Sequence, residues 1–388
     1  MTKCARIMPD PSRRPRIAHV TWTYGGTQEG ISRSVTELVR DQRSWADVAV
    51  LAARVEDDEQ GVQVVPVALD VLDRRLPFAL GFARASARTL RRLGPFDMVH
   101  AHVPTLARPD VATVHLFPPR KLIALVRETM RRTGQDLPTA MARRFRLVGL
   151  TSWTYARNIG GNTALIAVSP RVAAALVDEY GLDPRAAHTI PLGITPPDTR
   201  VRPGLRPDTP RRVALFVGHQ FVTKGLGFAI DALVRLGDAA PYLVVIGEGS
   251  EGSLTAMRDY ATARGLSGQI RFDGVQRNVG DYYAMADMLI YPTFFDTFGL
   301  VIGEALAAGL PVVTTRAAGI TDLLDASPAL QLVDTADDVA GLACAIGAIP
   351  ARGLVSKTSR DMVSGLTWAA HGKAVRELYR AVRPDIFG

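Results

Sequence analysis

The sequence predicts an α/β protein built from two doubly wound domains. Short β-branched runs alternate with segments of helical periodicity, a Pro-rich polar interval at 191–210 interrupts this alternation, and the alternation then restarts. Alternation of this kind is typical of parallel sheets with helices on both faces. A chain of 388 residues with 47% hydrophobic content is long enough for two domains, each with its own core.

Each half of the chain supplies its own alternating elements. We expect strands at 16–21, 48–52, 98–101, 111–115, 165–168, 213–217, 242–246, 270–272 and 288–291, and helices at 30–41, 171–180, 226–236, 254–264 and 279–286. Ligands bind at the carboxyl ends of parallel strands. The loops after these strands, in a cleft between the two domains, are therefore the expected place for chemistry.

Bulk composition excludes several classes of protein. Cys4 and Cys344 are the only cysteines and lie far apart, so neither a disulfide framework nor a zinc site is expected. The N-terminal sequence lacks the apolar core of a signal peptide, and no run of about 18 apolar residues occurs. We therefore expect a cytoplasmic protein that does not span a membrane.

Positive charge is concentrated in one part of the chain. Residues 71–160 hold 16 Lys and Arg against 5 Asp and Glu, whereas residues 201–388 hold 18 against 19. Within the first range, segments 74–92 and 120–146 mix Arg and apolar positions at near-helical spacing, which is typical of helices lying on an anionic membrane surface. A solvated basic face explains the pattern equally well. No nucleic-acid-binding motif accompanies these residues, so a nucleic-acid partner is not expected.

The segment 293–315 is the most informative stretch. It places Asp296 and Glu304 eight positions apart around the expected start of a helix, with Thr297 as the expected N-cap. The amides of 298–301 would then be unpaired donors, which suits a phosphate, and Glu304 would lie roughly 9 Å beyond that turn. This arrangement matches the sugar, pyrophosphate and ribose of a nucleotide sugar. Taken alone, the segment suits an ordinary amphipathic helix with a solvated Glu304 equally well.

Loops after other expected strands carry groups that suit the same ligand. Gly25 and Gly26 form a turn that lets backbone amides approach an anion closely. Lys224 lies at a strand-to-helix junction, where its charge would meet a pyrophosphate, although a lone lysine is usually just solvated. His100, His102 and His115 lie at strand ends, where histidines are more often structural. No set of residues has metal-ligand spacing and no Gly-x-Ser-x-Gly elbow is present, which argues against metal and hydrolase chemistry.

Taken together and in order, these motifs resemble the GT-B retaining glycosyltransferases of family 4, which include lipopolysaccharide-core and phosphatidylinositol mannosyl transferases. The resemblance runs through YGGTQEG, VHAH, TVHLF, IAVSP, TIPLGI, FVGHQFVTKGL, VVIGEG, FDGV and 293–315 to Leu-Thr-Trp at 366–368. It implies an acceptor-binding Rossmann-like domain at 1–195, a nucleotide-sugar-binding one at 196–365, and a C-terminal segment, 366–388, whose helix returns to the N-terminal domain. It implies no cofactor and no metal.

The resemblance also implies a role for each matching residue. His115, Lys224 and Asp296 would be catalytic: His115 would contact the sugar or the reacting oxygen, Lys224 the pyrophosphate and Asp296 the sugar hydroxyls. Glu304 would bind the ribose, and the acceptor would contact Gln28 and His102. The donor would contact Gly25, Gly26, Gly218, His219, Lys224, Val275, Gln276, Asp296, Phe298, Gly299, Leu300, Val301 and Glu304.

Three positions depart from the family pattern. Asp296 stands where Glu is usual, so the carboxylate reaches one methylene less far. His219 stands where an Arg is usual, which makes neutralisation of the pyrophosphate weaker or pH-dependent. Leu192 replaces the usual Asn of a Pro-Asn-Gly turn. The identity of the donor is therefore left open.

The implied reaction is transfer of a hexose-type sugar from a nucleoside diphosphate to an acceptor hydroxyl with retained configuration. The leaving phosphate would take the acceptor proton, while Lys224 and the helix-start amides stabilise its charge. The basic, apolar N-terminal segments favour a lipid-linked or cell-surface glycan as acceptor. Two alternatives stay open: a small soluble natural-product acceptor, and a catalytically silent protein that binds a nucleotide sugar or a partner.

Overall fold

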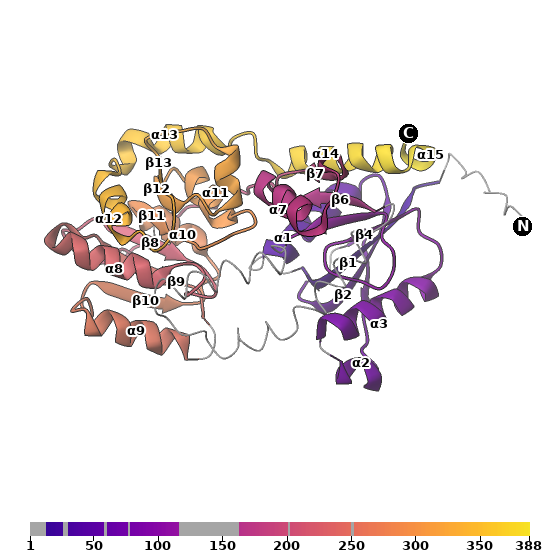
Figure 1. Cartoon of the computed structure of the whole chain (residues 1–388), viewed down its shortest axis with the longest axis horizontal. Coiled ribbons are helices and arrows are strands. Elements are labelled where there is room, and N and C mark those ends of the chain that lie inside the picture. Colours follow the sequence, from indigo (N-terminus) through magenta and orange to yellow (C-terminus); the bar gives the residue numbers. More distant parts are fainter. Residues whose placement is uncertain are drawn as a thin grey trace, which may run out of the picture.

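The computed structural model describes residues 13–25, 30–57, 60–76, 78–115, 163–200, 202–249 and 252–388. Within these ranges the chain forms two parallel sheets with helices on both faces (Figure 1). The strand orders are β3-β2-β1-β4-β5-β6-β7 and β10-β9-β8-β11-β12-β13, and every strand pair is parallel. Both orders reverse beside the first strand of the sheet, so the predicted fold class of two doubly wound domains is confirmed.

The N-terminal sheet contains all five predicted strands and two more. Its strands are β1 (Arg16–Tyr24), β2 (Asp47–Val55), β3 (Gln63–Pro66), β4 (Met98–Ala101), β5 (Val111–Val114), β6 (Ala164–Ala167) and β7 (Ala187–Thr189). The two unpredicted strands, β3 and β7, are the short sheet edges. None of their residues is fully buried, so they lack the hydrophobic run that reveals a central strand.

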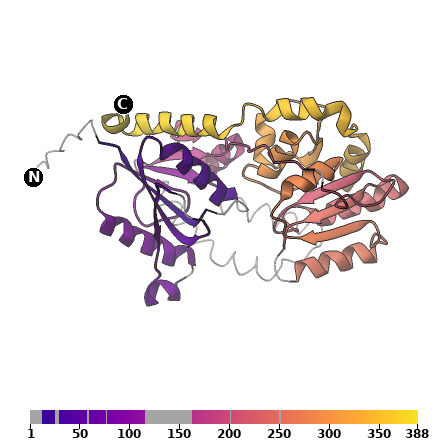
Figure 2. The same cartoon turned by 180° about the vertical axis from the view of Figure 1, so that it is seen from behind.

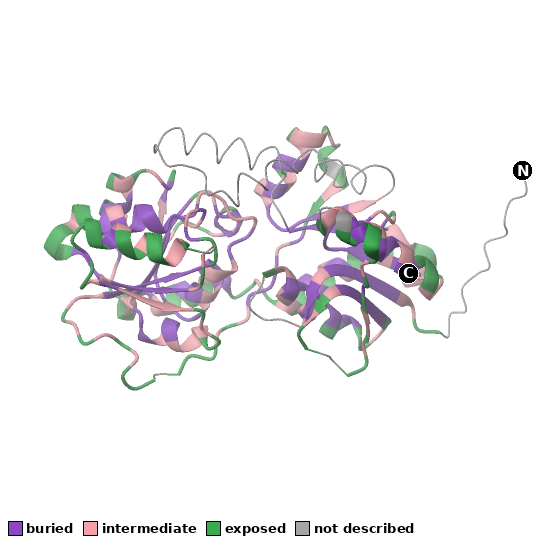
Figure 3. Cartoon of the chain, turned by 90° about the horizontal axis from the view of Figure 1, so that it is seen from below, coloured by how far each residue is buried: buried purple, intermediate pink, exposed green. Residues whose placement is uncertain are grey.

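Helices cover both faces of this sheet. The helices are α1 (Gly30–Gln42), α2 (Val71–Arg75), α3 (Phe78–Leu93), α7 (Pro170–Tyr180) and α14 (Trp368–Val382). Neighbouring residues of β1 point to opposite faces. Ile17 therefore packs with Val39 of α1 and Tyr379 of α14, whereas Ala18 packs with Phe82 of α3. Figure 3 shows the buried residues following the strands between these layers.

The C-terminal sheet repeats this plan. Its strands are β8 (Val213–Val217), β9 (Tyr242–Ile246), β10 (Ile270–Gly274), β11 (Met288–Tyr291), β12 (Val312–Thr315) and β13 (Leu330–Val333), and its helices are α8 (Leu226–Leu236), α9 (Ser253–Ala263), α10 (Val279–Met285), α11 (Leu300–Ala307), α12 (Val339–Ala348) and α13 (Arg352–Val363). The strands predicted from β8 to β11 coincide with those observed to within two residues. One apolar cluster continues from Leu165 and Val172 of the N-terminal domain into Leu215 and Ile302 of the C-terminal domain.

Two crossings of the chain connect the domains. Near residue 194 the outgoing segment meets the returning one, since the Ile194 amide donates to the Leu366 carbonyl (2.8 Å) and Trp368 Nε1 donates to Thr195 Oγ1 (2.9 Å). The returning helix α14, capped by Thr367, then runs over the N-terminal domain, where α15 (Pro384–Phe387) follows (Figure 2). The domain boundaries at 195 and 365 stay predictions.

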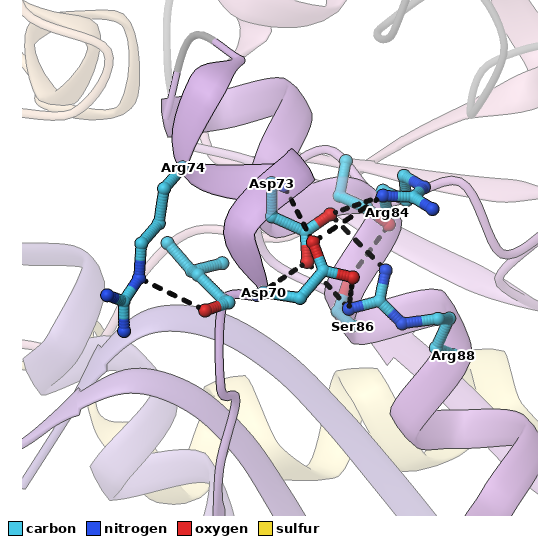
Figure 4. Close-up of polar contacts among 8 residues, drawn as sticks. Asp70, Asp73, Arg74, Arg84, Ser86 and Arg88 are labelled. Atoms are coloured by element: carbon cyan, nitrogen blue, oxygen red, sulfur yellow. Dashed lines mark hydrogen bonds and ion pairs between the residues drawn. The ribbon is translucent and has the colours of Figure 1, made fainter.

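The basic segment 74–92 is explained by packing within the N-terminal domain. The buried Asp73 carboxylate accepts from Arg88 (2.6 Å) and Arg84 (3.0 Å), and these contacts, led by the Arg88 hydrogen bond, lower the pKa of Asp73 to about 2 (Figure 4). Helix α3 buries its apolar face, including Phe82 and Leu90, against the sheet. Two arginines of the segment and its apolar face are thus engaged within the domain, and membrane binding by this segment stays a prediction. Segment 120–146 lies outside the described residues.

We find no single helix in the described ranges that is both long and apolar enough to cross a membrane. The bent pair 339–348 and 352–382, whose parts meet at 109°, meets that criterion by length and composition only.

Candidate active site

The predicted site residues follow the central strands of both sheets. His102 follows β4, His115 follows β5, Gly218 follows β8 and Asp296 lies in the loop after β11. The two sets of strand-end loops meet at Thr297, whose hydroxyl donates to the His115 carbonyl (2.8 Å). We call this region, with the residues that bond across it, the domain junction.

Thr297 does not cap helix α11, so that prediction is wrong. The helix begins at Leu300, and its N-cap is Gly299, whose φ of +96° lies in the left-handed region that glycine adopts readily. The Thr297 hydroxyl bonds to His115 instead, and its carbonyl accepts from Ser169 (2.7 Å). Thr297 therefore joins the two domains.

The start of α11 nevertheless presents unpaired amides. Phe298 N donates to the Asp296 carboxylate (3.3 Å). The amides of Gly299, Leu300 and Val301 have no acceptor among the described residues. Three of the four predicted amides are thus available to an anion at the positive end of a helix.

Lys224 and Asp296 form an ion pair at the domain junction. Lys224 Nζ lies 2.6 Å from Asp296 Oδ2, and the Tyr291 hydroxyl donates to the same oxygen (2.8 Å). Burial raises the pKa of Asp296, but Lys224 and the hydrogen bonds lower it by more, so the net shift is downward and the carboxylate stays ionised. The two predicted catalytic groups therefore bind each other.

Glu304 is held by both domains. Arg33 of α1 pairs with its Oε1, and the Tyr283 hydroxyl donates to its Oε2 (3.0 Å). The Glu304 side chain is only 12% exposed, and that of Arg33 is 20% exposed. A ribose that used this carboxylate would therefore have to share it with these partners or replace one of them.

The other predicted donor contacts surround the Lys224–Asp296 pair in different ways, and Gly218 lies directly against the Lys224 side chain. Gly25, at a φ of +87°, packs against the Asp57 backbone. His219 is exposed, with Nδ1 4.0 Å from the Glu248 carboxylate. Val275 is exposed, Gln276 donates to the Asp273 carbonyl (2.6 Å), and Gly218 N donates to the Ile246 carbonyl (3.1 Å). Gly26 and Gln28 lie outside the described residues. In the described part of the chain, no hydrogen bond joins these groups to Lys224.

Behind His115 lies a row of buried histidines. His115 Nε2 is 3.1 Å from His102 Nδ1, His102 Nε2 is 2.9 Å from His19 Nδ1, and His19 Nε2 is 2.6 Å from Gln42 Oε1. Burial lowers the pKa of His19 to about 4 and of His115 to about 3, and it lowers that of His102 well below its usual value. Both ring nitrogens of His102 are bonded to other histidines, so an acceptor would have to displace one of these bonds. The predicted acceptor contact of His102 stays a prediction.

Three of the histidines are close enough to suggest a metal site. Ring nitrogens of His19, His100 and His102 lie within 4.8 Å of one another. However, His100 bonds to the Tyr379 hydroxyl (2.7 Å) and to Thr113 (2.7 Å), so all six ring nitrogens already have protein partners. A metal would have to displace these bonds. The predicted absence of a metal stays a prediction.

Sequence reasoning missed the residues that hold the predicted ones. Tyr291 and Tyr283 each donate to a predicted carboxylate, and Arg33 pairs across the domain junction. No local motif marks them, since their partners come from other elements. His19 did offer a signal, because it is a polar residue within the otherwise buried apolar run of β1.

Two doubly wound domains that meet at their strand ends define the GT-B class of α/β protein. Family models match both halves of the chain: Glycosyltransferase Family 4 matches residues 29–196, and Glycosyl transferases group 1 matches residues 211–350. The D-inositol 3-phosphate glycosyltransferase of Geodermatophilus obscurus is 30% identical, over 76% of this chain and 68% of its own. That of Xylanimonas cellulosilytica is 29% identical, over 77% and 78%. The chain belongs to the family 4 (group 1) glycosyltransferases.

Solved structures share the fold across the whole length. WaaG, a glycosyltransferase involved in lipopolysaccharide biosynthesis, aligns with a TM-score of 0.73 at 18% identity over 94% of this chain and 99% of its own. Sucrose-phosphate synthase from Thermosynechococcus elongatus aligns with a TM-score of 0.76 at 18% identity, over 96% and 100%. Anabaena HepE, solved with UDP-glucose, aligns with a TM-score of 0.68 at 15% identity, over 94% and 99%.

Proposed function

We propose that the protein transfers a hexose-type sugar from a nucleoside-diphosphate sugar to an acceptor hydroxyl with retained configuration, on a lipid-linked or cell-surface glycan. The observation that carries this proposal is the cluster of charge at the start of α11. The three unpaired amides lie between Asp296 and Glu304 along the chain, and sugar, pyrophosphate and ribose follow one another in the same order in a nucleotide sugar. The UDP-glucose bound in HepE supports a donor of this class.

Donor binding would exchange the partners of the ion pair. The pyrophosphate would draw Lys224 away from Asp296, and the released carboxylate, still held by Tyr291, would accept hydroxyls of the sugar. Ionised Asp296 cannot donate a proton, so its role is to bind and orient. In this scheme Lys224 and Asp296 bind the donor, and no further charged side chain is needed for that step.

The reaction would then proceed on one face of the sugar. The bond between the anomeric carbon and the phosphate oxygen breaks, the acceptor oxygen bonds to that carbon from the same face, and the acceptor proton passes to the leaving phosphate. Lys224 and the amides of Gly299, Leu300 and Val301 would stabilise the charge that develops on this phosphate. We propose no metal requirement, and activity in excess EDTA tests that point.

A smaller acceptor is the second candidate. Several relatives at 28–30% identity are D-inositol 3-phosphate glycosyltransferases, and inositol 3-phosphate is a small phosphorylated acceptor. WaaG of Escherichia coli, 27% identical over 41% of this chain, acts on lipopolysaccharide by its name and favours the glycan. Assays with inositol phosphate and with a lipid-linked glycan separate the two.

A screen of UDP-, GDP- and ADP-sugars tests the function. A donor at 100 times its Kd should stabilise the protein by about 2.7 kcal/mol. It should also be hydrolysed slowly to the nucleoside diphosphate, and the anomeric configuration of the product can be assigned by NMR. Binding without any turnover would favour a silent binding protein, and the absence of binding to every donor would contradict the proposal.

A further inference from the structure

A continuous hydrogen-bonded chain leads from helix α14 to the domain junction. It begins at the Tyr379 hydroxyl, passes through Gln42 of α1 and His19 of β1, and reaches His102 and then His115. The imidazoles become more exposed toward the junction, from 0% at His19 to 3% at His102 and 6% at His115. His115, which follows β5 where the domains meet, is therefore the outer end of the chain.

The Gln42 amide sets the direction of every proton in the chain. Its Nε2 donates to Tyr379 (3.2 Å), so the oxygen, which can only accept, faces His19 Nε2. A neutral imidazole carries one N–H, so His19 donates from Nε2 and accepts at Nδ1. By the same rule His102 donates from Nε2 to His19, and His115 donates from Nε2 to His102.

His115 is thus left with an unprotonated Nδ1. In the described part of the chain this nitrogen has no hydrogen-bond partner. The Thr297 hydroxyl of the other domain donates to the His115 carbonyl, which fixes the backbone that carries the His115 ring. An imidazole held in this state can accept a hydrogen bond but cannot donate one at Nδ1.

We propose that the chain Tyr379–Gln42–His19–His102 is a positioning device that holds His115 as its Nε2–H tautomer, so that Nδ1 accepts a hydrogen bond from a substrate hydroxyl. The inference rests on the proposed function. It assigns to His115 a subsite for a hydroxyl group, carried by the donor sugar or by the acceptor. An ionised phosphate oxygen is excluded at His115 Nδ1, because both atoms are acceptors and neither carries a proton.

Burial supports a chain that stays neutral. It lowers the pKa of His19 to about 4 and of His115 to about 3, so neither ring gains a second proton near pH 7. Every ring nitrogen of His19 and His102 is bonded, which leaves no donor or acceptor in the middle of the chain unsatisfied. The tautomer of each histidine in the row therefore determines the tautomer of the next one.

The chain also gives α14 a role at the site. Tyr379 accepts from Gln42 and donates to His100 Nδ1, whose Nε2–H then donates to Thr113. The hydroxyl therefore fixes the amide orientation at the far end from His115. A helix contributed by the last part of the chain thus acts on the junction through four intervening bonds, without touching the substrate.

Nitrogen-15 NMR of the histidine-labelled full-length protein without substrate tests the chain directly. His115 should be protonated at Nε2 and bare at Nδ1. Gln42→Met removes the directing oxygen at nearly constant volume and should give His115 mixed tautomers. In Gln42→Glu, a carboxyl oxygen can still accept from His19, so the wild-type tautomer should return. Protonation of wild-type His115 at Nδ1, or an unchanged tautomer in Gln42→Met, would overturn the proposal.

Kinetics test what the tautomer does. With the nucleotide sugar that is turned over in the screen, Gln42→Met should lower kcat/KM by roughly tenfold, and Gln42→Glu should recover most of it. A fall in both donor hydrolysis and transfer places the hydroxyl on the donor sugar, whereas a fall in transfer alone places it on the acceptor. Unchanged rates despite a changed tautomer would overturn the role.

A matched control separates positioning from stability. Ser86→Ala removes another buried hydrogen bond of the same domain, to Thr105 (3.0 Å), on the opposite face of the sheet. It should lower the unfolding free energy and leave both the His115 tautomer and kcat/KM unchanged. The NMR result does not depend on turnover, so failure of the proposed function and failure of this chain remain distinguishable.

Discussion

The two sides of the domain junction use opposite chemistry. On the C-terminal side, Lys224, Asp296 and Glu304 are joined to partners by ion pairs. On the N-terminal side, His115 ends a row of buried rings that bond to one another through their ring nitrogens and leave its Nδ1 without a partner in the described part of the chain. An anion needs mobile charge that can be redirected toward it, whereas a hydroxyl needs one acceptor held in a fixed direction. The difference suits a pyrophosphate on one side and a hydroxyl on the other.

Loss of the Lys224 ammonium group should have the largest effect on activity. Lys224→Met should lower kcat by about a hundredfold to a thousandfold, because it removes a donor that stabilises the leaving phosphate. Lys357→Met is the matched control, since Lys357 is exposed and, among the described residues, its ion-pair partner is Asp361 on its own helix. Steady-state kinetics at saturating donor measure the effect. Equal kcat values in the two variants would contradict a role for Lys224 in the reaction.

The sequence identified candidate residues on both sides of the junction but not the bonds that hold them. Asp296, Lys224 and His115 lie within ordered motifs after strands, so local pattern and family resemblance both single them out. The bonds of Glu304 to Arg33 and of His19 to Gln42 join residues 271 and 23 positions apart. Such pairs depend on how the helices pack on the sheet, and no local period encodes that. The edge strands and the cap of α11 were missed for a related reason, since tertiary contacts decide them.

As the pH falls, protonation of the buried histidines should lower the stability of the protein before protonation of Asp296 does. The pKa of His19 is lowered to about 4 and that of His115 to about 3, chiefly by burial, against an unfolded value of about 6.5. The unfolded state therefore binds more protons below pH 6.5. Stability is complete above that pH and falls toward pH 4, by up to about 1.4 kcal/mol per pH unit for each such histidine. The pKa of Asp296 is lowered too, so its contribution is lost only below the usual carboxylate range.

Urea unfolding at pH 7.5, 6.0 and 5.0 measures this slope. His100 is fully buried and its pKa is also lowered, so His100→Gln should lower the overall stability and also reduce the slope by about one proton. His188→Gln, at an exposed position, is the control and should keep the wild-type slope. An unchanged slope in His100→Gln would show that the buried histidines do not set the acid sensitivity.

The Arg33–Glu304 pair should show a smaller effect whose sign is informative. A ribose that needs Glu304 competes with Arg33, so Arg33→Met should raise donor affinity by roughly threefold, whereas Glu304→Gln should lower it by about tenfold. Calorimetric titration with the donor measures both values. Arg40→Met, which removes an exposed pair with Glu37 on the same helix, is the control. Weaker binding in Arg33→Met would show that Arg33 itself contacts the donor.

The smallest effect is expected at the corner between α2 and α3. Arg84 and Arg88 are engaged by Asp73 within the domain, whereas the apolar side chains of Val71, Leu72 and Phe78 at this corner are exposed and could insert into a bilayer. Val71→Ser with Phe78→Ser should therefore lower liposome flotation at low salt by about twofold to threefold.

Leu354→Ser, at an 81% exposed position of the C-terminal domain, is the matched control for that flotation. Equal flotation of the double variant and this control would assign any membrane attachment to other parts of the chain. A loss confined to the double variant would place the corner between α2 and α3 at the lipid surface and would support the proposed lipid-linked acceptor.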